Sequence, residues 1–201
     1  MIIGCKGWND RSGYFRQDNN EVEEFLRAYG VKQYYATCFP TSVCRAISAT
    51  RDERNLWCKT SAGAEIQPET AVTMIMNNPN NRHIFAAIRN DPDVIDMPEN
   101  QVPQYMPAAF KMAFDEEVIF DWADAQAIKN LIVSRIHAVV PIKKPGHAVC
   151  FVAYDNMTDE FIYDDPLYGF NLRIRFDKLE TSLKYWNGVT PIVYARGSYE
   201  N

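Results

Sequence analysis

The 201-residue sequence has no hydrophobic run that approaches the roughly 20 residues needed to cross a bilayer, and it does not begin like a signal peptide. It also lacks a basic block, and its formal net charge of -5 is mild for this length. Proteins that bind nucleic acid or anionic membranes carry clustered positive charge. We therefore expect a cytoplasmic protein that binds neither nucleic acid nor a membrane, and the oligomeric state stays open.

The cysteines are too few and too scattered for a disulfide framework or a zinc site. They number five, an odd count, and no two of them form a Cys-x-x-Cys pair. The acidic run at residues 115–117 has no histidine near it, so we interpret it as a solvated face rather than a metal site. The sequence therefore predicts reduced thiols, no metal and no cofactor.

Internal repeats and low-complexity linkers are absent, and a hydrophobic content of 47% in 201 residues suffices for one sizeable core. We expect a single domain over residues 1–201. Apolar residues recur with helical period in residues 22–29, in the segment after Cys38 and in residues 123–136. A Pro/Asn-rich middle, residues 77–107, predicts surface loops.

Strand patterns gather in the later part of the chain. β-branched and alternating segments predict a helix-fed strand and then an antiparallel meander, at residues 139–142, 147–154, 160–163, 172–176 and 192–194. Helices early and strands late indicate the α+β class.

Cys38 is the strongest candidate for a nucleophile. Pro40 stands near the first helical position after it, so the thiol lies at or beside a helix N-terminus. Free N–H groups and the helix dipole favour an anion there, and the thiolate is the form of cysteine that attacks carbonyls. A buried structural cysteine is the competing interpretation.

Two further residues can complete a catalytic set with Cys38. His147 opens a predicted strand directly after Gly146, whereas His137 ends a predicted helix, where an imidazolium would complement the dipole. Asp164 and Asp165 close the neighbouring strand of the same hairpin, from which a carboxylate can reach across to orient a histidine. The sequence predicts that Cys38, His147 and Asp165 converge.

The segments TCFPTSVCRAI, GHAVCFVAYD and FIYDDPLYGF resemble, in this order, the C39-like branch of the papain-like cysteine peptidases. That resemblance implies a papain-like fold, with N-terminal helices packed on a C-terminal antiparallel sheet. It implies Cys38 as nucleophile, His147 as base and Asp165 as orienting carboxylate, with Asp164 as the fallback. It also implies a phage or bacterial thiol protease, released or injected where it is a phage protein, with a peptide or a peptidoglycan stem peptide as substrate.

Two positions around the nucleophile bear on activity. Phe39 replaces the glycine that follows the nucleophile in the family pattern, and a bulky ring there would narrow the cleft. The second oxyanion donor is expected to be a glutamine amide upstream, for which Gln17 and Gln33 both remain candidates. The expected function is a cysteine peptidase or amidase. The alternative, favoured by Phe39, is a non-catalytic papain-like interaction protein, for example a phage factor that binds a host protein.

Overall fold

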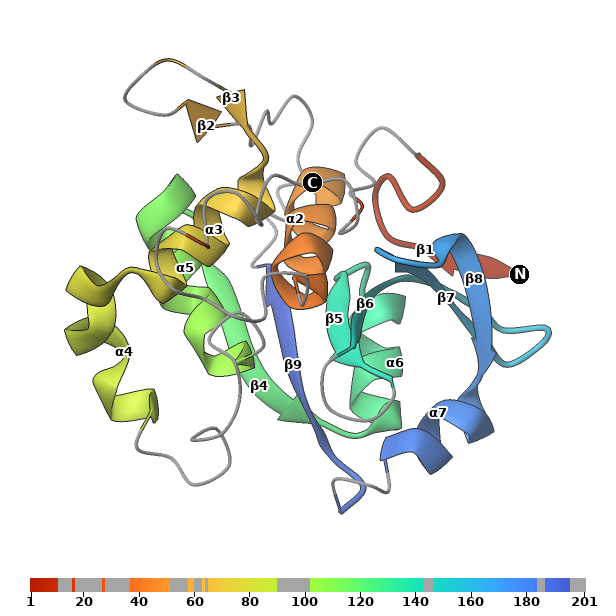
Figure 1. The fold of residues 1–201 in the computed structure, drawn as a ribbon. Coiled ribbons are helices and arrows are strands. Elements are labelled where there is room, and N and C mark those ends of the chain that lie inside the picture. The colour runs from red at the N-terminus through yellow and green to blue at the C-terminus, as the bar shows by residue number, and fades with distance from the viewer. Residues whose placement is uncertain are drawn as a thin grey trace.

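The computed structural model describes residues 1–10, 16, 27, 37–50, 58–59, 63, 65–89, 102–142, 147–183 and 187–195. Within these residues a seven-stranded sheet contains six strands in the order β4-β9-β5-β6-β7-β8 (Figure 1). The seventh strand, β1, pairs with the end of β6 that β5 does not reach. Every strand pair in it is antiparallel. The strands are β1 (Ile2–Gly4), β4 (Val118–Ala123), β5 (Ala138–Pro141), β6 (Ala148–Asp155), β7 (Glu160–Asp165), β8 (Gly169–Arg175) and β9 (Thr190–Ala195).

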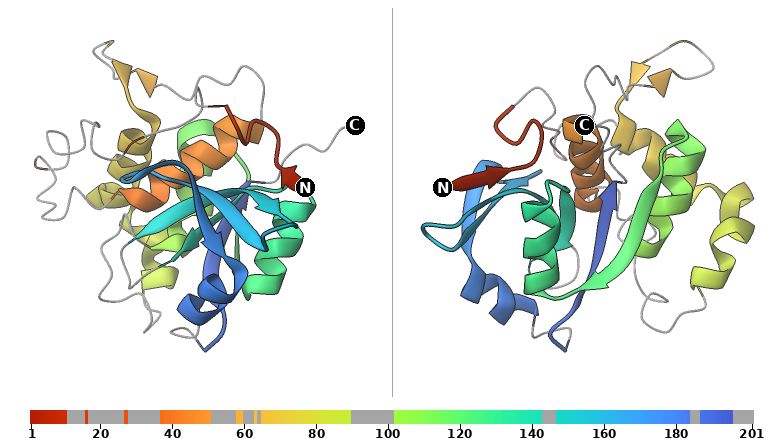
Figure 2. Two further views of the ribbon diagram at one scale, coloured as in Figure 1. Left: turned by 90° about the vertical axis from the view of Figure 1, so that its right-hand side faces the viewer. Right: turned by 180° about the vertical axis from the view of Figure 1, so that it is seen from behind.

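Helices cover both faces of this sheet. Helices α2 and α6 lie on opposite sides of β5 and β6 (Figure 2), and α2 also packs against α3. A small separate hairpin joins β2 (Cys58–Lys59) to β3 (Glu65–Ile66). The helices are α2 (Cys38–Thr50), α3 (Pro68–Asn77), α4 (Arg82–Arg89), α5 (Met106–Phe114), α6 (Ala125–Val133) and α7 (Phe176–Leu183), with single 3-10 turns η2 (Pro79–Asn81) and η4 (Pro103–Tyr105).

Strand β6 is buried on both faces, between the layer that contains α2 and the layer that contains α6. All eight of its residues are buried. Because successive side chains of a strand point to opposite faces, Cys150 and Val152 enter the hydrophobic core shared with α2, whereas Val149 and Phe151 enter the core shared with α6. A strand with both faces covered carries a continuous apolar run, and GHAVCFVAYD is such a run.

The prediction of mixed helices and antiparallel strands is confirmed, but the described parts of the middle of the chain, residues 77–89 and 102–107, were wrongly predicted as loops. Where residues 77–107 are described, they form η2, α4, η4 and the start of α5. Pro79, Pro103 and Pro107 each occupy a first turn, where proline begins a helix because its missing N–H would be unpaired there in any case. The predicted helix at residues 22–29 lies outside the described residues, except for Arg27.

The sequence analysis also missed two strands of the large sheet, both strands of the small β2–β3 hairpin and one buried acid. Strand β4 precedes α6, and β1 pairs with β6 from the far end of the chain, so the order is not simply helices and then strands. Glu116, expected on a solvated face, is 1% exposed. The chain turns inward there because Asp115 ends α5 in a left-handed conformation, with φ of 57°.

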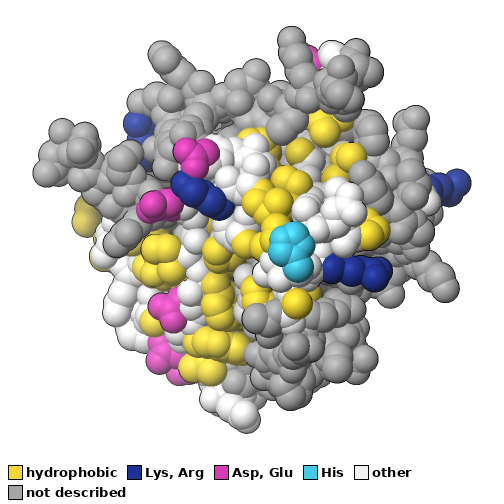
Figure 3. Space-filling view, turned by 90° about the vertical axis from the view of Figure 1, so that its left-hand side faces the viewer, with side chains coloured by type: hydrophobic (Ala, Val, Ile, Leu, Met, Phe, Trp, Pro, Cys, Tyr) yellow, Lys and Arg dark blue, Asp and Glu magenta, His cyan; other side chains and the backbone are white. Residues whose placement is uncertain are grey.

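The surface formed by the helices on the α4 and α5 side is partly apolar. Figure 3 shows a band of hydrophobic side chains on this face, flanked by acidic side chains. Ile84 of α4 and Met112 of α5 are among the large hydrophobic residues that remain exposed. In the part of the chain that the structure describes, no helix has the length and hydrophobicity needed to cross a membrane.

Candidate active site

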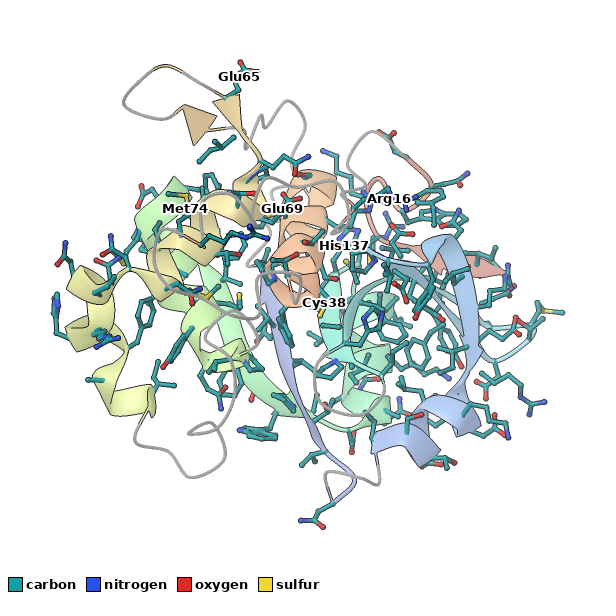
Figure 4. All side chains as sticks on the ribbon, in the orientation of Figure 1. Arg16, Cys38, Glu65, Glu69, Met74 and His137 are labelled. Atoms are coloured by element: carbon teal, nitrogen blue, oxygen red, sulfur yellow. The ribbon has the colours of Figure 1, made fainter. Side chains whose placement is uncertain are left out.

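Cys38 is the first residue of α2, and its thiol faces the start of β6. The backbone N–H of Ala148 donates to Cys38 Sγ at 3.3 Å, and the Cys38 side chain is 1% exposed. Figure 4 labels Cys38 at the end of helix α2. The first N–H groups of a helix have no intrahelical acceptor, so the start of α2 is a region of partial positive charge. A helix start of this kind favours negative charge on an oxygen held beside it.

His147 and Asp165 meet at the adjoining ends of β6 and β7. His147 directly precedes β6, Asp165 is the last residue of β7, and the two strands are antiparallel neighbours. His147 Nε2 donates to Asp165 Oδ2 at 2.9 Å. The other oxygen, Oδ1, accepts the N–H groups of Leu167 and Tyr168 at 2.9 and 3.0 Å. The turn after β7 therefore holds the carboxylate, and the carboxylate orients the imidazole.

The electrostatics of this pair favour an imidazolium. Burial lowers the pKa of His147, but hydrogen bonds to Asp165 and Cys38 and the charges of both partners outweigh burial and raise that pKa to about 9. For Asp165, burial raises the pKa, and the hydrogen bonds from His147 and from the Leu167 and Tyr168 N–H groups bring it below its ordinary value. His147 is therefore protonated at neutral pH, in contact with the carboxylate of Asp165 on one side and with Cys38 on the other.

Asp164 does not serve as the fallback carboxylate. Its Oδ2 accepts from Arg45 Nε at 2.6 Å, and its Oδ1 accepts the N–H of Asn171 at 2.9 Å. Adjacent residues of a strand point to opposite faces, so Asp164 turns toward α2 while Asp165 turns toward His147. The structure thus brings Cys38, His147 and Asp165 together and keeps Asp164 in a separate buried ion pair.

Phe39 does not project from the helix into solvent. It is 4% exposed and belongs to the same hydrophobic core as Val43 and Ile47. The ring packs among apolar neighbours at the start of α2, in the cluster that also contains Cys38, and its expected narrowing of a cleft stays a prediction. The two oxyanion candidates, Gln17 and Gln33, lie outside the described residues.

The other two histidines are separate from this set. His83 is exposed on α4, where its Nδ1 lies 3.0 Å from the carbonyl oxygen of Asn80. His137 follows α6 but does not act as a charged cap, because its side chain is fully buried before β5 (Figure 4). Burial, aided by the charge of Arg45, lowers the pKa of His137 to about 3, so the ring is neutral.

We expect His137 to make the protein sensitive to acid. Its pKa is about 3 in the folded state against about 6.5 in an unfolded chain, so the unfolded state binds more protons between these values. The free energy of unfolding therefore falls as the pH drops from about 6.5 toward 3, by at most about 1.4 kcal/mol per pH unit from this residue. Urea unfolding at pH 7.5 and 4.5 should show a smaller loss for His137→Leu than for the wild type.

Exposed His83 supplies the control for that measurement, since His83→Leu should keep the wild-type loss. Asp165 also loses stabilisation in acid, but it is present in all three proteins and cancels from the comparison. An equal loss for His137→Leu and the wild type would contradict the prediction.

In the part of the chain that the structure describes, no three or more histidine, cysteine, aspartate or glutamate residues are grouped so that they could hold a metal ion. A surface groove of about 280 Å³ lies between α6 and strands β4 and β9, lined in part by Trp122, Leu131 and Tyr194. It contains none of the three candidate catalytic residues and does not mark their site.

Sequence reasoning missed two residues that join helix α2 to the sheet. Ser42 Oγ donates to the carbonyl oxygen of Ala148 at 3.1 Å, and Arg45 forms the ion pair with Asp164. Both follow Cys38 at helical spacing, i+4 and i+7, which is the signal that could have identified them. Their side chains alone do not indicate which strand they contact.

The chain matches no protein-family model, and no curated protein is significantly similar to it.

Proposed function

We propose that the protein is a cysteine peptidase or amidase with a papain-like arrangement, in which Cys38 is the nucleophile, His147 the acid–base and Asp165 the orienting carboxylate. One observation carries the proposal. A thiol at a helix N-terminus contacts an imidazole that donates to a carboxylate at 2.9 Å, which is the nucleophile, base and orienting group that acyl transfer requires.

The steps follow from this geometry. The Cys38 thiolate attacks an amide carbonyl, forms a C–S bond and pushes the carbonyl electron pair onto oxygen. The helix N-terminal N–H groups stabilise that oxyanion, each donor contributing on the order of 3 kcal/mol. The imidazolium of His147 then gives its proton to the leaving amine as the C–N bond breaks, and a water molecule deprotonated by neutral His147 hydrolyses the thioester.

The substrate is a peptide or amide, and a peptidoglycan stem peptide is the finer hypothesis that the motif resemblance suggests. The exposed ring of Tyr168 stands edge-on to His147, with ring centroids 5.8 Å apart. A group that leaves toward His147 would pass this aromatic surface, which suits an apolar or aromatic side chain next to the scissile bond.

Cysteine reactivity provides the first test. We expect iodoacetamide at pH 7 to modify Cys38 well before Cys5 and Cys150, because only an activated thiolate reacts quickly. Burial raises the pKa of Cys5 to about 12 and that of Cys150 well above its ordinary value, so these two thiols are internal controls. Mass spectrometry of peptides from briefly treated native protein measures the order of modification.

The same preparation should release new amines from a mixed peptide library or from purified bacterial peptidoglycan, and iodoacetamide should stop that release. Slow modification of Cys38 together with no amine release would reject the hydrolase and leave the interaction protein. Fast modification of Cys38 with release from peptides but not from peptidoglycan would keep the peptidase and reject the stem-peptide substrate.

A further inference from the structure

One face of helix α2 is bonded to the sheet at three successive turns. Cys38, Ser42 and Arg45 share this face, since residues at i, i+4 and i+7 of a helix lie one above the other. Cys38 Sγ accepts the Ala148 N–H at 3.3 Å, and Ser42 Oγ donates to the Ala148 carbonyl oxygen at 3.1 Å. Arg45 lies about 10 Å from Cys38 along the helix axis and donates to the carboxylate of Asp164 at 2.6 Å. The helix is therefore held at its active end and again two turns later.

The Arg45 contact joins more than two elements. Its Nη2 also donates to the carbonyl oxygen of Gly7 at 3.1 Å, and the second oxygen of Asp164 accepts the N–H of Asn171 in β8. Arg45 and Asp164 are 2% and 1% exposed. A guanidinium presents its donors in a rigid planar fork, so these bonds set the direction of the side chain as well as its distance.

Stability alone is a poor explanation for this buried ion pair. Removing both charges from water costs about as much free energy as their attraction returns, and an apolar pair of similar volume is often at least as stable. The pair differs from an apolar contact in its fixed geometry. It also acts beside the site, because Asp164 directly precedes Asp165, and a catalytic set tolerates errors of only about 0.5 Å.

We propose that Arg45 is a positioning residue, which holds helix α2 to the end of β7 through Asp164 and so keeps Cys38 in contact with His147. This inference rests on the proposed function, since it assigns Arg45 a role in aligning the proposed nucleophile with its acid–base. Arg45 itself contacts neither of those two side chains through any described hydrogen bond.

The pKa of His147, followed through the ring proton signals of an NMR pH titration, tests this role directly. Contact with Cys38 raises that pKa. In Arg45→Met the contact should loosen, and the pKa of His147 should fall by about one pH unit or more toward its value in Cys38→Ala, since an opposite charge in contact moves a pKa by about 1 to 3 units. Mere loss of the arginine charge would act in the opposite direction, because removing a nearby cation makes an imidazolium easier to form.

Arg173→Met is the matched control. Arg173 pairs with Asp155 and Glu160 near the opposite end of the same hairpin, is 42% exposed, and should leave the pKa of His147 unchanged when replaced. Native folding is checked by circular dichroism and by continued protection of Cys5 and Cys150 from iodoacetamide. If Arg45→Met does not fold, Arg45→Lys is measured instead, because it keeps the charge but loses the planar fork, and the same fall is expected.

A His147 pKa that stays constant or rises in the folded Arg45 variant would overturn the positioning role. This outcome is distinct from failure of the proposed function, which is judged by hydrolysis in the wild type. If the wild type shows no hydrolysis but the pKa of His147 still falls in Arg45→Met, then Arg45 does hold the contact between Cys38 and His147. Only the catalytic role of that contact would be rejected.

Discussion

Replacing Cys38 by alanine is expected to abolish hydrolysis, with turnover falling by about 10⁴-fold or more to the background rate, because the proposed mechanism forms the thioester on this sulfur. The fold should persist. Cys38 is buried, but the change removes only the sulfur atom, at a cost of about 1 kcal/mol in the free energy of unfolding. Amine release by purified variant and wild type, on the substrate found in the library screen, measures the effect.

Cys44→Ala is the matched control for this substitution. Cys44 lies on the same helix, is fully buried and loses the same atom, yet it belongs to the core and not to the catalytic set. It should keep near-wild-type turnover with a similar small loss of stability. Turnover that survives in Cys38→Ala, or that disappears equally in Cys44→Ala, would eliminate Cys38 as the nucleophile.

Replacing His147 is expected to have the second largest effect, a loss of roughly 10³- to 10⁴-fold in kcat/KM, since general acid–base catalysis contributes on this scale. His147→Gln keeps a donor for Asp165 but cannot carry a proton to the leaving amine. Modification of Cys38 by iodoacetamide should slow in parallel, because the imidazolium that stabilises the thiolate is gone. Exposed His83→Gln is the control and should change neither rate.

The pH dependence of the wild type should report the same group. Since the pKa of His147 is about 9, the proton needed by the leaving amine is present below that value, and kcat/KM should fall on an alkaline limb near pH 9. The contribution of His147 to the free energy of unfolding changes with pH in the same direction. Its raised pKa stabilises the folded state fully below about pH 6.5, and this contribution disappears as the pH rises through 9. The free energy of unfolding of His147→Gln should therefore be lower than that of the wild type below about pH 6.5 and should approach the wild-type value as the pH rises to 9. If iodoacetamide modified Cys38 in His147→Gln as fast as in the wild type, the side chains of Cys38 and His147 would not be in contact.

Local pattern sufficed for most elements of the later half of the chain. The apolar run of β6, the alternation in β8 and the helical period of α6 are properties of neighbouring residues, so the α+β class and the hairpin from β6 to β7 could be predicted. The convergence of Cys38, His147 and Asp165 was predicted from a helix start, a strand start and a strand end. The middle of the chain was misjudged because proline marks loops and helix first turns alike.

The sequence by itself determined which groups could do chemistry: one cysteine at a helix N-terminus, one histidine opening a strand, and two adjacent carboxylates closing the next strand. Asp165 was preferred to Asp164 through a motif resemblance, and only the tertiary structure gives the physical reason: strand alternation turns Asp164 toward Arg45 and Asp165 toward His147, and the packing of α2 chooses the face. The tertiary structure also decided that Phe39 enters the core and that His137 is neutral. Burial and long-range partners set these outcomes, and both arise from residues far apart in the chain, which no local pattern contains.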